Sequence, residues 1–289
     1  MKNGIFFLLI VNVLVSCKPE PLDINIKQAP EKLSFSNQYL GDGLFGVVMS
    51  KSFSGLKQPF RAGDSTQMID SSLLISGASI RLIGSNVALT LEPLSTGIYG
   101  VNQLNLIDGE KYRMEANHPV LGSIWAEAVK MEKVRFDSIN FEVTEDDKNI
   151  DLHFSFTENQ STKNYYVVNY LLVKKDEPIP NKPDPEYISR RIFEQQARFD
   201  LFSDADAVNG KIEVKRKLLN QGISDSLWLS LSHISEEYYH FLEAQRRGGT
   251  LFNQLRGEVI NYPSNIHNGY GFFSLHEPDI ILTRRIKVR

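Results

Sequence analysis

The sequence predicts a mainly β protein: an N-terminal immunoglobulin-like β-sandwich, followed by a second antiparallel β domain with one helix near its C-terminal end. Three observations support this fold class. Short segments of alternating apolar and polar residues, separated by turn residues, recur over 33–131. A second set of such segments begins at residue 132. A single segment, 235–247, instead has apolar residues at helical spacing.

The predicted strands of the first domain, 33–131, are short and end at glycine-containing turns such as Asp108-Gly109. Runs of this length and spacing are typical of a sandwich and need no helix. We expect these strands at 44–49, 78–83, 87–91, 98–101, 112–116 and 123–129.

The second domain, 132–289, contains a nearly continuous apolar run at 165–173 (YYVVNYLLV). Its β-branched and aromatic residues predict a central strand, because both faces of such a strand are buried. Four prolines in 177–186 predict an exposed loop. We expect the remaining strands at 134–143, 150–156, 199–202, 211–217 and 226–231, with a turn at Asn209-Gly210.

The predicted helix, 235–247, has start and stop signals of its own. Ser235 is a suitable N-cap, and Ile234 and Tyr239 stand at the positions of a hydrophobic staple. Gly248-Gly249 then ends the helix. Its aromatic residues predict packing against the sheet more than a ligand platform.

Residues 1–16 resemble a secretory signal peptide, with a basic start and an apolar segment too short to span a bilayer. The segment ends in Leu14-Val15-Ser16-Cys17, which resembles a bacterial lipobox. We therefore expect Cys17 to carry palmitate-type acyl chains, although a simple secretory peptide with an incidental cysteine is the alternative. Residues 17–32 hold three prolines and no apolar period, so we expect a lipidated tether.

Composition restricts the partners of this chain. The formal net charge is −3, and the hydrophobic and charged fractions, 42% and 23%, are ordinary. Such values argue against disorder and against a membrane barrel. No basic stripe is present, so no nucleic acid is expected as a partner.

The sequence contains no recognisable catalytic centre. None of the six histidines is two or four residues from another, the spacing at which one element presents two metal ligands. There is no nucleophile elbow, P-loop or dinucleotide motif. Asp204 and Asp206 favour a turn capped by their carboxylates over a calcium loop. We expect no catalytic residue, no metal and no cofactor.

Several ordered segments carry a resemblance to a known family. They are 109–114 (GEKYRM), 202–204 (FSD), 209–211 (NGK), 234–242 (ISEEYYHFL) and 263–273 (PSNIHNGYGFF). In this order they resemble the lipoprotein family of Bacteroidota known as domain-of-unknown-function family 4249. Genes of such lipoproteins often lie beside those of TonB-dependent receptors, so the resemblance implies an accessory subunit of a transporter. It carries over no catalytic residue.

The last of these segments supplies the candidate contact residues Asn265, Asn268, Tyr270 and Phe272. Asparagine and glycine tolerate left-handed backbone, here at Asn265, Asn268 and Gly269, and Gly271 permits the close approach of another strand. We expect a tight turn that leads into a strand at 271–275. A structural role is the main interpretation, and contact with a partner or ligand is the alternative.

Three serines resemble sites that Bacteroidota O-glycosylate on exported proteins. They are Ser65, Ser138 and Ser226, each of which follows an aspartate. Attachment of a glycan would require these serines to be exposed.

These observations favour a non-enzymatic lipoprotein of the outer membrane that binds a TonB-dependent receptor and assists substrate capture. The acids within 18–23 partly resemble an export signal, so we expect the cell surface. An independent module that binds glycan or peptide is the second interpretation, and a hydrolase with scattered catalytic residues is the third. A protein-binding subunit should expose an apolar patch, whereas a ligand module should have a concave pocket.

Overall fold

A computed structural model describes residues 31–39, 44–52, 73–144, 148–159, 162–174, 199–220, 224–248 and 262–284, which lie in one compact unit. Several sequence predictions fall outside these residues: the signal peptide 1–16, acylation of Cys17, the tether up to residue 30, the loop 177–186 and Ser65. Within the described ranges, no helix is both long and apolar enough to cross a membrane.

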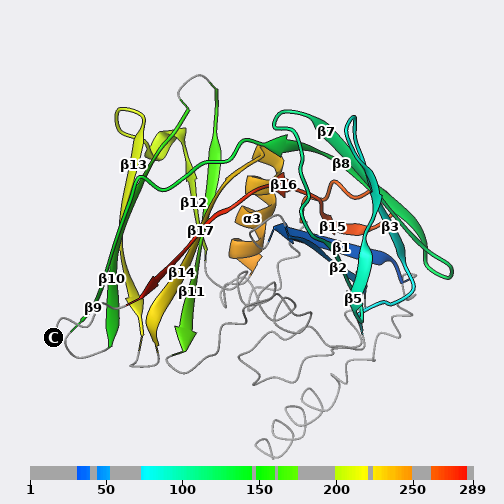
Figure 1. Cartoon of the computed structure of the whole chain (residues 1–289), viewed down its shortest axis with the longest axis horizontal. Helices are drawn as coiled ribbons and strands as arrows, with labels where there is room; N and C mark the ends of the chain where they lie inside the picture. The colour runs from blue at the N-terminus through cyan, green and yellow to red at the C-terminus, as the bar shows by residue number, and fades with distance from the viewer. Residues whose placement is uncertain are drawn as a thin grey trace, which may run out of the picture. The chain divides into compact units, whose positions relative to one another are not determined.

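The first half of the chain supplies two sheets that pack face to face (Figure 1). Their strand orders are β15-β1-β2-β6-β5 and β16-β8-β7-β3-β4, in which the edge strands β15 (Tyr270–Phe272) and β16 (Leu275–His276) come from the second half. The strands from this half are β1 (Leu33–Tyr39), β2 (Phe45–Lys51), β3 (Ser79–Ile83), β4 (Ala88–Thr90), β5 (Glu92–Ser95), β6 (Ile98–Val101), β7 (Lys111–His118) and β8 (Gly122–Met131).

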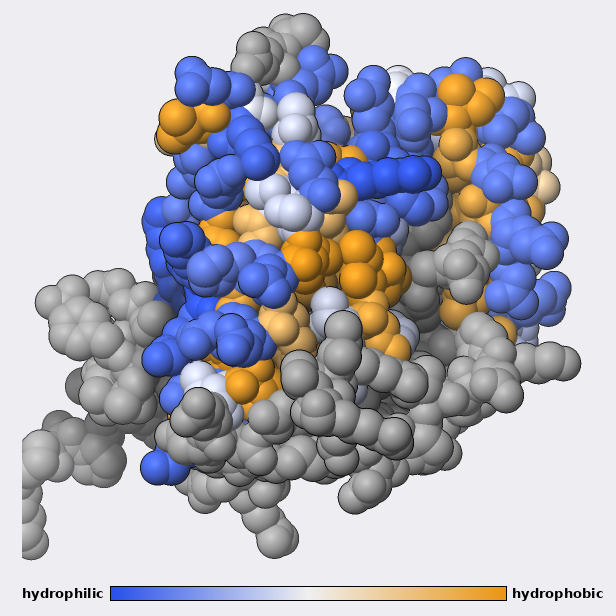
Figure 2. Space-filling model, turned by 60° about the vertical axis from the view of Figure 1, so that its left-hand side comes forward, coloured by the Kyte–Doolittle hydropathy of each residue, from blue (hydrophilic) through white to orange (hydrophobic). Residues whose placement is uncertain are grey.

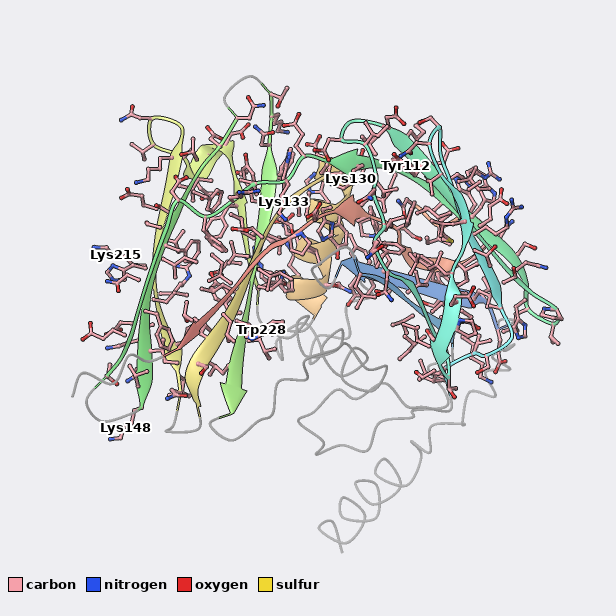
Figure 3. The ribbon with its side chains drawn as sticks, viewed as in Figure 1. Tyr112, Lys130, Lys133, Lys148, Lys215 and Trp228 are labelled. Atoms are coloured by element: carbon pink, nitrogen blue, oxygen red, sulfur yellow. The ribbon has the colours of Figure 1, made fainter. Side chains whose placement is uncertain are left out.

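Tyr112 on β7 anchors the core between these two sheets (Figure 3). Its side chain is only 1% exposed, and its hydroxyl donates to Asn86 Oδ1 at 2.9 Å and accepts from the Ile107 amide at 2.8 Å. A buried tyrosine needs such partners, because an unsatisfied hydroxyl would cost free energy. Packing therefore explains Tyr112 within the segment 109–114.

The second half forms another pair of sheets, with orders β13-β10-β9 and β12-β11-β14-β17. Its elements are β9 (Ser138–Val143), β10 (Asn149–Thr157), β11 (Tyr165–Lys174), β12 (Phe199–Ser203), the 3₁₀ turn η2 (Asp204–Asp206), β13 (Lys211–Leu219), β14 (Ser224–Ile234), α3 (Glu236–Gly248) and β17 (Asp279–Arg284). As predicted, β11 is a central strand. A separate core, rich in Phe, Tyr and Leu, fills the space between these sheets.

Helix α3 packs on the face of β11 and β14 that points away from this second core. Its Leu242 lies in a buried cluster with Tyr165, Val167 and Ile234. The Tyr238 amide donates to the Ser235 hydroxyl at 3.3 Å, which confirms the predicted N-cap. Because alternate residues of a strand point to opposite faces, β11 serves the second core with one set of side chains and the helix with the other.

Residues 262–276, here called the terminal block, return from the second half to the first. They contain β15 (Tyr270–Phe272), which pairs in parallel with β1, and β16 (Leu275–His276), which pairs in parallel with β8. Phe273 and Leu275 are fully buried in the first core. The block thus lies in space with the first sandwich, although in sequence it belongs to 132–289. The division of the chain near residue 131 stays a prediction.

The predicted fold class is confirmed: the protein is mainly β, with antiparallel sheets in sandwich arrangement and one helix among the described residues. Several strands differ from expectation. Strands β1 and β17 were not predicted. The strand predicted at 271–275 is divided into β15 and β16, because the amides of Phe273 and Ser274 donate to asparagine side chains instead of to a neighbouring strand. The strand predicted at 134–143 begins only at Ser138, because the Phe136 amide donates to Asp279 Oδ2 at 3.0 Å instead of to a neighbouring strand. Strand β5 was not predicted, since Pro93 argues against a strand. The proline is tolerated because β5 lies at the edge of its sheet.

Gly271 is the position where the terminal block depends most on one residue type. Its φ is +104°, and a Cβ added there would lie 1.9 Å from the Phe35 carbonyl oxygen on β1. We predict that Gly271→Ala lowers the free energy of unfolding by at least about 3 kcal/mol in urea denaturation, because backbone strain and a backbone clash add.

Gly109→Ala is the matched control for Gly271→Ala. Gly109 also has positive φ, +79°, but a Cβ there would meet nothing within 4 Å. Its replacement should cost only the conformational strain, about 1 kcal/mol. Equal losses of stability in the two variants would contradict the close approach of β1 and β15.

Candidate functional site

Asn265, the first predicted contact residue, holds the terminal block together. Its amide Nδ2 donates to the Phe273 carbonyl at 2.8 Å and to the Glu127 carbonyl of β8 at 3.3 Å. Its Oδ1 accepts from the Phe273 amide at 2.8 Å. The side chain therefore acts like a short piece of paired backbone, which is the structural role that the sequence favoured.

The turn after Asn265 is only partly as predicted. Asn268 is exposed and has left-handed backbone, with φ of 64°. Asn265 and Gly269 do not adopt positive φ, so that part of the prediction is wrong. Gly269 is instead constrained by space, because a Cβ would lie 2.7 Å from both the Leu33 carbonyl oxygen and an Ile124 methyl.

The two aromatic candidates have different surroundings. Phe272 is 6% exposed and packs against Tyr238 and Phe241 of α3, with ring centroids 5.2 Å apart in each case. Tyr270 is 48% exposed, and the Lys32 ammonium lies 5.5 Å from the centre of its ring. Tyr270 and Asn268 are thus open to a partner, whereas Phe272 is covered by the helix.

The structure adds a stack of rings that the sequence did not indicate. The imidazole of His267 lies 3.6 Å from the ring of Trp125 on β8, with an angle of only 7° between them. The Arg113 guanidinium of β7 lies 4.1 Å from the centre of the same ring. The His267 amide also donates to the Trp125 carbonyl at 2.8 Å. The sequence feature that could have indicated this stack is a tryptophan at an outward-facing position of a strand, because so large a ring is usually covered.

Several exposed side chains follow the terminal block, with His267 stacked on Trp125 and Tyr270 beside Lys32. We call this set the terminal-block face, made of Tyr262, His267, Asn268 and Tyr270 with the adjoining Lys32 and Trp125. Tyr262, 46% exposed, lies just before Ser264, whose hydroxyl donates to the Gly271 carbonyl at 2.8 Å. The face therefore combines exposed rings with a backbone that is held by hydrogen bonds.

A buried polar pair lies at the end of the terminal block. The Ser274 hydroxyl is 3.0 Å from His276 Nδ1, and both side chains are buried. Desolvation, reinforced by the positive charges of Lys130 and His233, lowers the pKa of His276 to about 3. The imidazole is therefore neutral at physiological pH and, being enclosed, has no access to a substrate.

Lys133 joins the two chain segments that connect the halves, whereas the ammonium of Lys130 is bound within the first half (Figure 3). Lys130 is 3% exposed; its ammonium donates to Asp108 Oδ1 at 2.9 Å and to the Met131 carbonyl at 2.8 Å. Lys133 pairs with Glu277 at 2.6 Å. A buried ammonium requires such partners, so the role of Lys130 is structural.

Of the two carboxylates of η2, Asp206 caps the turn as the sequence favoured, whereas Asp204 binds the backbone just before β11. Asp204 accepts from the Asn164 amide at 2.9 Å and 3.1 Å, and Asp206 accepts from the Ser203 amide at 2.8 Å. The pKa of the neighbouring Glu158 carboxyl is raised, mainly by burial and also by its interaction with Asp204. In the described part of the chain, no group of three or more His, Cys, Asp or Glu side chains is arranged to hold a metal ion.

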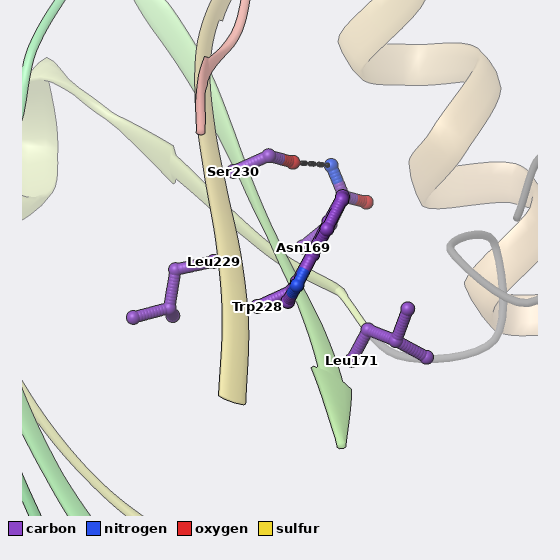
Figure 4. A pocket seen from close by; sticks show the side chains of 5 residues that line it. All are labelled: Asn169, Leu171, Trp228, Leu229 and Ser230. Atoms are coloured by element: carbon purple, nitrogen blue, oxygen red, sulfur yellow. Dashed lines mark hydrogen bonds between the residues drawn. The ribbon is translucent and has the colours of Figure 1, made fainter. Parts of the chain in front are cut away.

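A small cavity lies on β11 and β14, lined by Asn169, Leu171, Trp228, Leu229 and Ser230 (Figure 4). Asn169 Nδ2 donates to the Ser230 hydroxyl across it at 3.0 Å. Its volume is about 10 Å³, enough for one water molecule at most. A sugar or a peptide side chain does not fit there.

The described glycosylation candidates differ in exposure. Ser138 is exposed at the start of β9, although its hydroxyl lies 2.7 Å from that of Ser155. Ser226 is 8% exposed within β14, between β11 and β17, so it lacks the exposure that a glycan requires. Glycosylation of Ser138 stays a prediction.

A family model described as "Domain of unknown function (DUF4249)" matches residues 50–279, which is most of the chain. The protein belongs to the DUF4249 family. This confirms the resemblance drawn from the short segments above. The terminal block of this DUF4249 member ends within the matched region, so the family model includes the residues that close the first sandwich.

Other comparisons identify no activity for this DUF4249 protein. No curated protein matches it. Matching solved structures include a DUF3823 family protein from Bacteroides ovatus, at 12% identity and TM-score 0.24, over 57% of this chain and 83% of that one. Another is a two-domain fibronectin type III segment of chicken tenascin, at 9% identity and TM-score 0.22, over 88% and 99%. Likenesses this weak carry no argument about the site.

We predict that His276 makes the fold sensitive to acid. Its pKa is about 3 in the folded protein, against about 6.5 in the unfolded chain, so the unfolded chain binds the extra proton between these values. The contribution of His276 to stability is complete above about pH 6.5 and is lost as the pH falls toward about 3. The free energy of unfolding should therefore decrease with acidification.

The measurement is urea denaturation at about pH 7 and about pH 4. His276→Asn keeps an acceptor for Ser274 without a titrating ring, so its stability should fall less with pH than that of the wild type. His153→Asn, at an exposed position, is the control and should keep the wild-type slope. The same slope for His276→Asn would show that the ring is not buried and neutral.

Proposed function

We propose that this DUF4249 protein is a non-enzymatic lipoprotein, anchored in the outer membrane through acylated Cys17, that binds a protein partner through the terminal-block face. The proposed partner is a TonB-dependent receptor, which the lipoprotein would assist in substrate capture at the cell surface. The exposure of Tyr262 and Tyr270 on a rigid, hydrogen-bonded segment is the observation that supports this most.

The chemistry of the face suits a protein interface. Tyrosine, tryptophan and arginine are the residues that contribute most to binding free energy at interfaces. Their rings bury a large area and lose little conformational entropy, in particular when they are already held in place. Here the Trp125 ring is stacked between neighbours and the Tyr270 backbone pairs with Ser34 of β1. The face is thus preorganised.

A second apolar area is a weaker candidate for the contact surface. Figure 2 brings the side of the second half forward and shows apolar side chains surrounded by hydrophilic ones. Among the described residues of this half, Phe141 of β9 is partly buried against the second core, and Leu282 of β17 is partly buried on its sheet. Both are more covered than Tyr262 and Tyr270, so we place the contact surface at the terminal block.

We predict that Tyr262→Ser with Tyr270→Ser weakens partner binding at least tenfold, because two half-exposed rings would be lost from the interface. The measurement is affinity isolation of the tagged, full-length protein in mild detergent, with quantitative mass spectrometry of the proteins retained. Val208→Ser is the matched control, since Val208 is 73% exposed in the turn before β13. Equal recovery of the partner by the double variant would exclude the face as its docking site.

Anchoring through Cys17 leads to a separate prediction. Cys17→Ser should stop acylation and leave the precursor uncleaved, because a lipoprotein signal peptidase acts only on the acylated cysteine. Immunoblotting of cell fractions should then show a longer protein that lacks the lipid. A correctly processed protein that still floats with outer membranes would refute the anchor.

A further inference from the structure

The point at which the chain enters the fold lies on the terminal-block face. Lys32 immediately precedes β1, and its ammonium lies 5.5 Å from the centre of the Tyr270 ring. In the pairing of β1 with β15, Ser34 is opposite Tyr270. The segment that leads back to Cys17 therefore leaves the described structure beside this ring.

The length of that segment limits how far the face can move from a lipid attached at Cys17. Lys32 is fifteen residues after Cys17. A chain of that length spans at most about 50 Å when fully extended, and about 20 Å on average if it is flexible. Anchoring would thus keep Tyr270 near the bilayer at all times and raise its effective concentration there.

The charge on the face indicates the chemistry of what it meets. In the described ranges, Lys32 has no carboxylate within ion-pair distance, and its amine rests over an aromatic ring instead. Arg113, by contrast, already pairs with Glu115 at 2.8 Å. The exposed ammonium of Lys32 and the half-exposed Tyr270 beside it offer hydrogen-bond donors that fit carboxylates.

We propose that the terminal-block face docks on an acidic protein surface that a membrane-embedded partner presents at the level of the lipid headgroups. The proposal rests on anchoring at Cys17 and on partner binding by this face. It adds the height of the partner's docking surface above the bilayer, and its charge. Tether length then controls occupancy, because a longer flexible tether dilutes the face roughly as the −3/2 power of its length.

The test is photo-crosslinking in intact cells with p-benzoylphenylalanine in place of Tyr262, an exposed ring that leaves Tyr270 and Lys32 intact. One form of the full-length lipoprotein carries the native tether, and another carries fifteen additional Gly/Ser residues after Asp23. Doubling the tether should lower the yield of the protein crosslink about threefold. The same insertion after Arg289 is the control and should leave the yield unchanged.

Charge is tested on the native tether. Lys32→Glu should reduce the crosslink strongly, and Lys32→Arg should retain it, because only the second keeps a cation over Tyr270.

Three results would overturn the proposal. A crosslink that does not respond to tether length or to Lys32→Glu would place the docking surface away from the headgroups while leaving partner binding intact. Crosslinks to lipid alone would replace the protein with the bilayer as the occupant. If no crosslink to protein forms with either tether, the partner-binding function proposed for this face fails as well.

Discussion

The pairing of the terminal block with both sheets of the first sandwich is the interaction on which the rest of the structure depends. Strand β15 adds to β1, and β16 adds to β8, so one short segment joins the edges of two sheets. Between them Phe273 is fully buried, worth roughly 2–3 kcal/mol of hydrophobic free energy. The close approach is possible only because Gly271 has no side chain.

The same segment also determines how the two halves are connected. After β16 the chain passes directly into β17 of the second half, and Lys133 pairs with Glu277 at this crossing. His276 and Lys130 are buried beside it, one neutral and one paired with Asp108. Buried polar groups with satisfied partners specify one arrangement over others, at some cost in stability. The exposed rings of the terminal block are therefore attached to a backbone that is held in one arrangement.

Patterns confined to neighbouring residues could be predicted from the sequence. The alternation in 150–156, the cap at Ser235 and the Asn209-Gly210 turn each depend on local backbone preference. For the terminal block, the sequence indicated a structural role and a close approach at Gly271. It did not indicate the partners β1 and β8, because β15 and β16 are too short to show a period. The stack of Trp125 and His267 joins residues more than a hundred positions apart, and no local pattern reports it.

Native-state hydrogen exchange of the Phe273 and Ser274 amides tests this central claim most directly. Each donates to an asparagine side chain, Asn265 or Asn37, within the first sandwich. If the block is an integral part of that sandwich, both amides should exchange only by global unfolding, with the same free energy as the amides of β7. Fast exchange of these two amides while β7 stays protected would show that the block opens on its own, and would contradict the account.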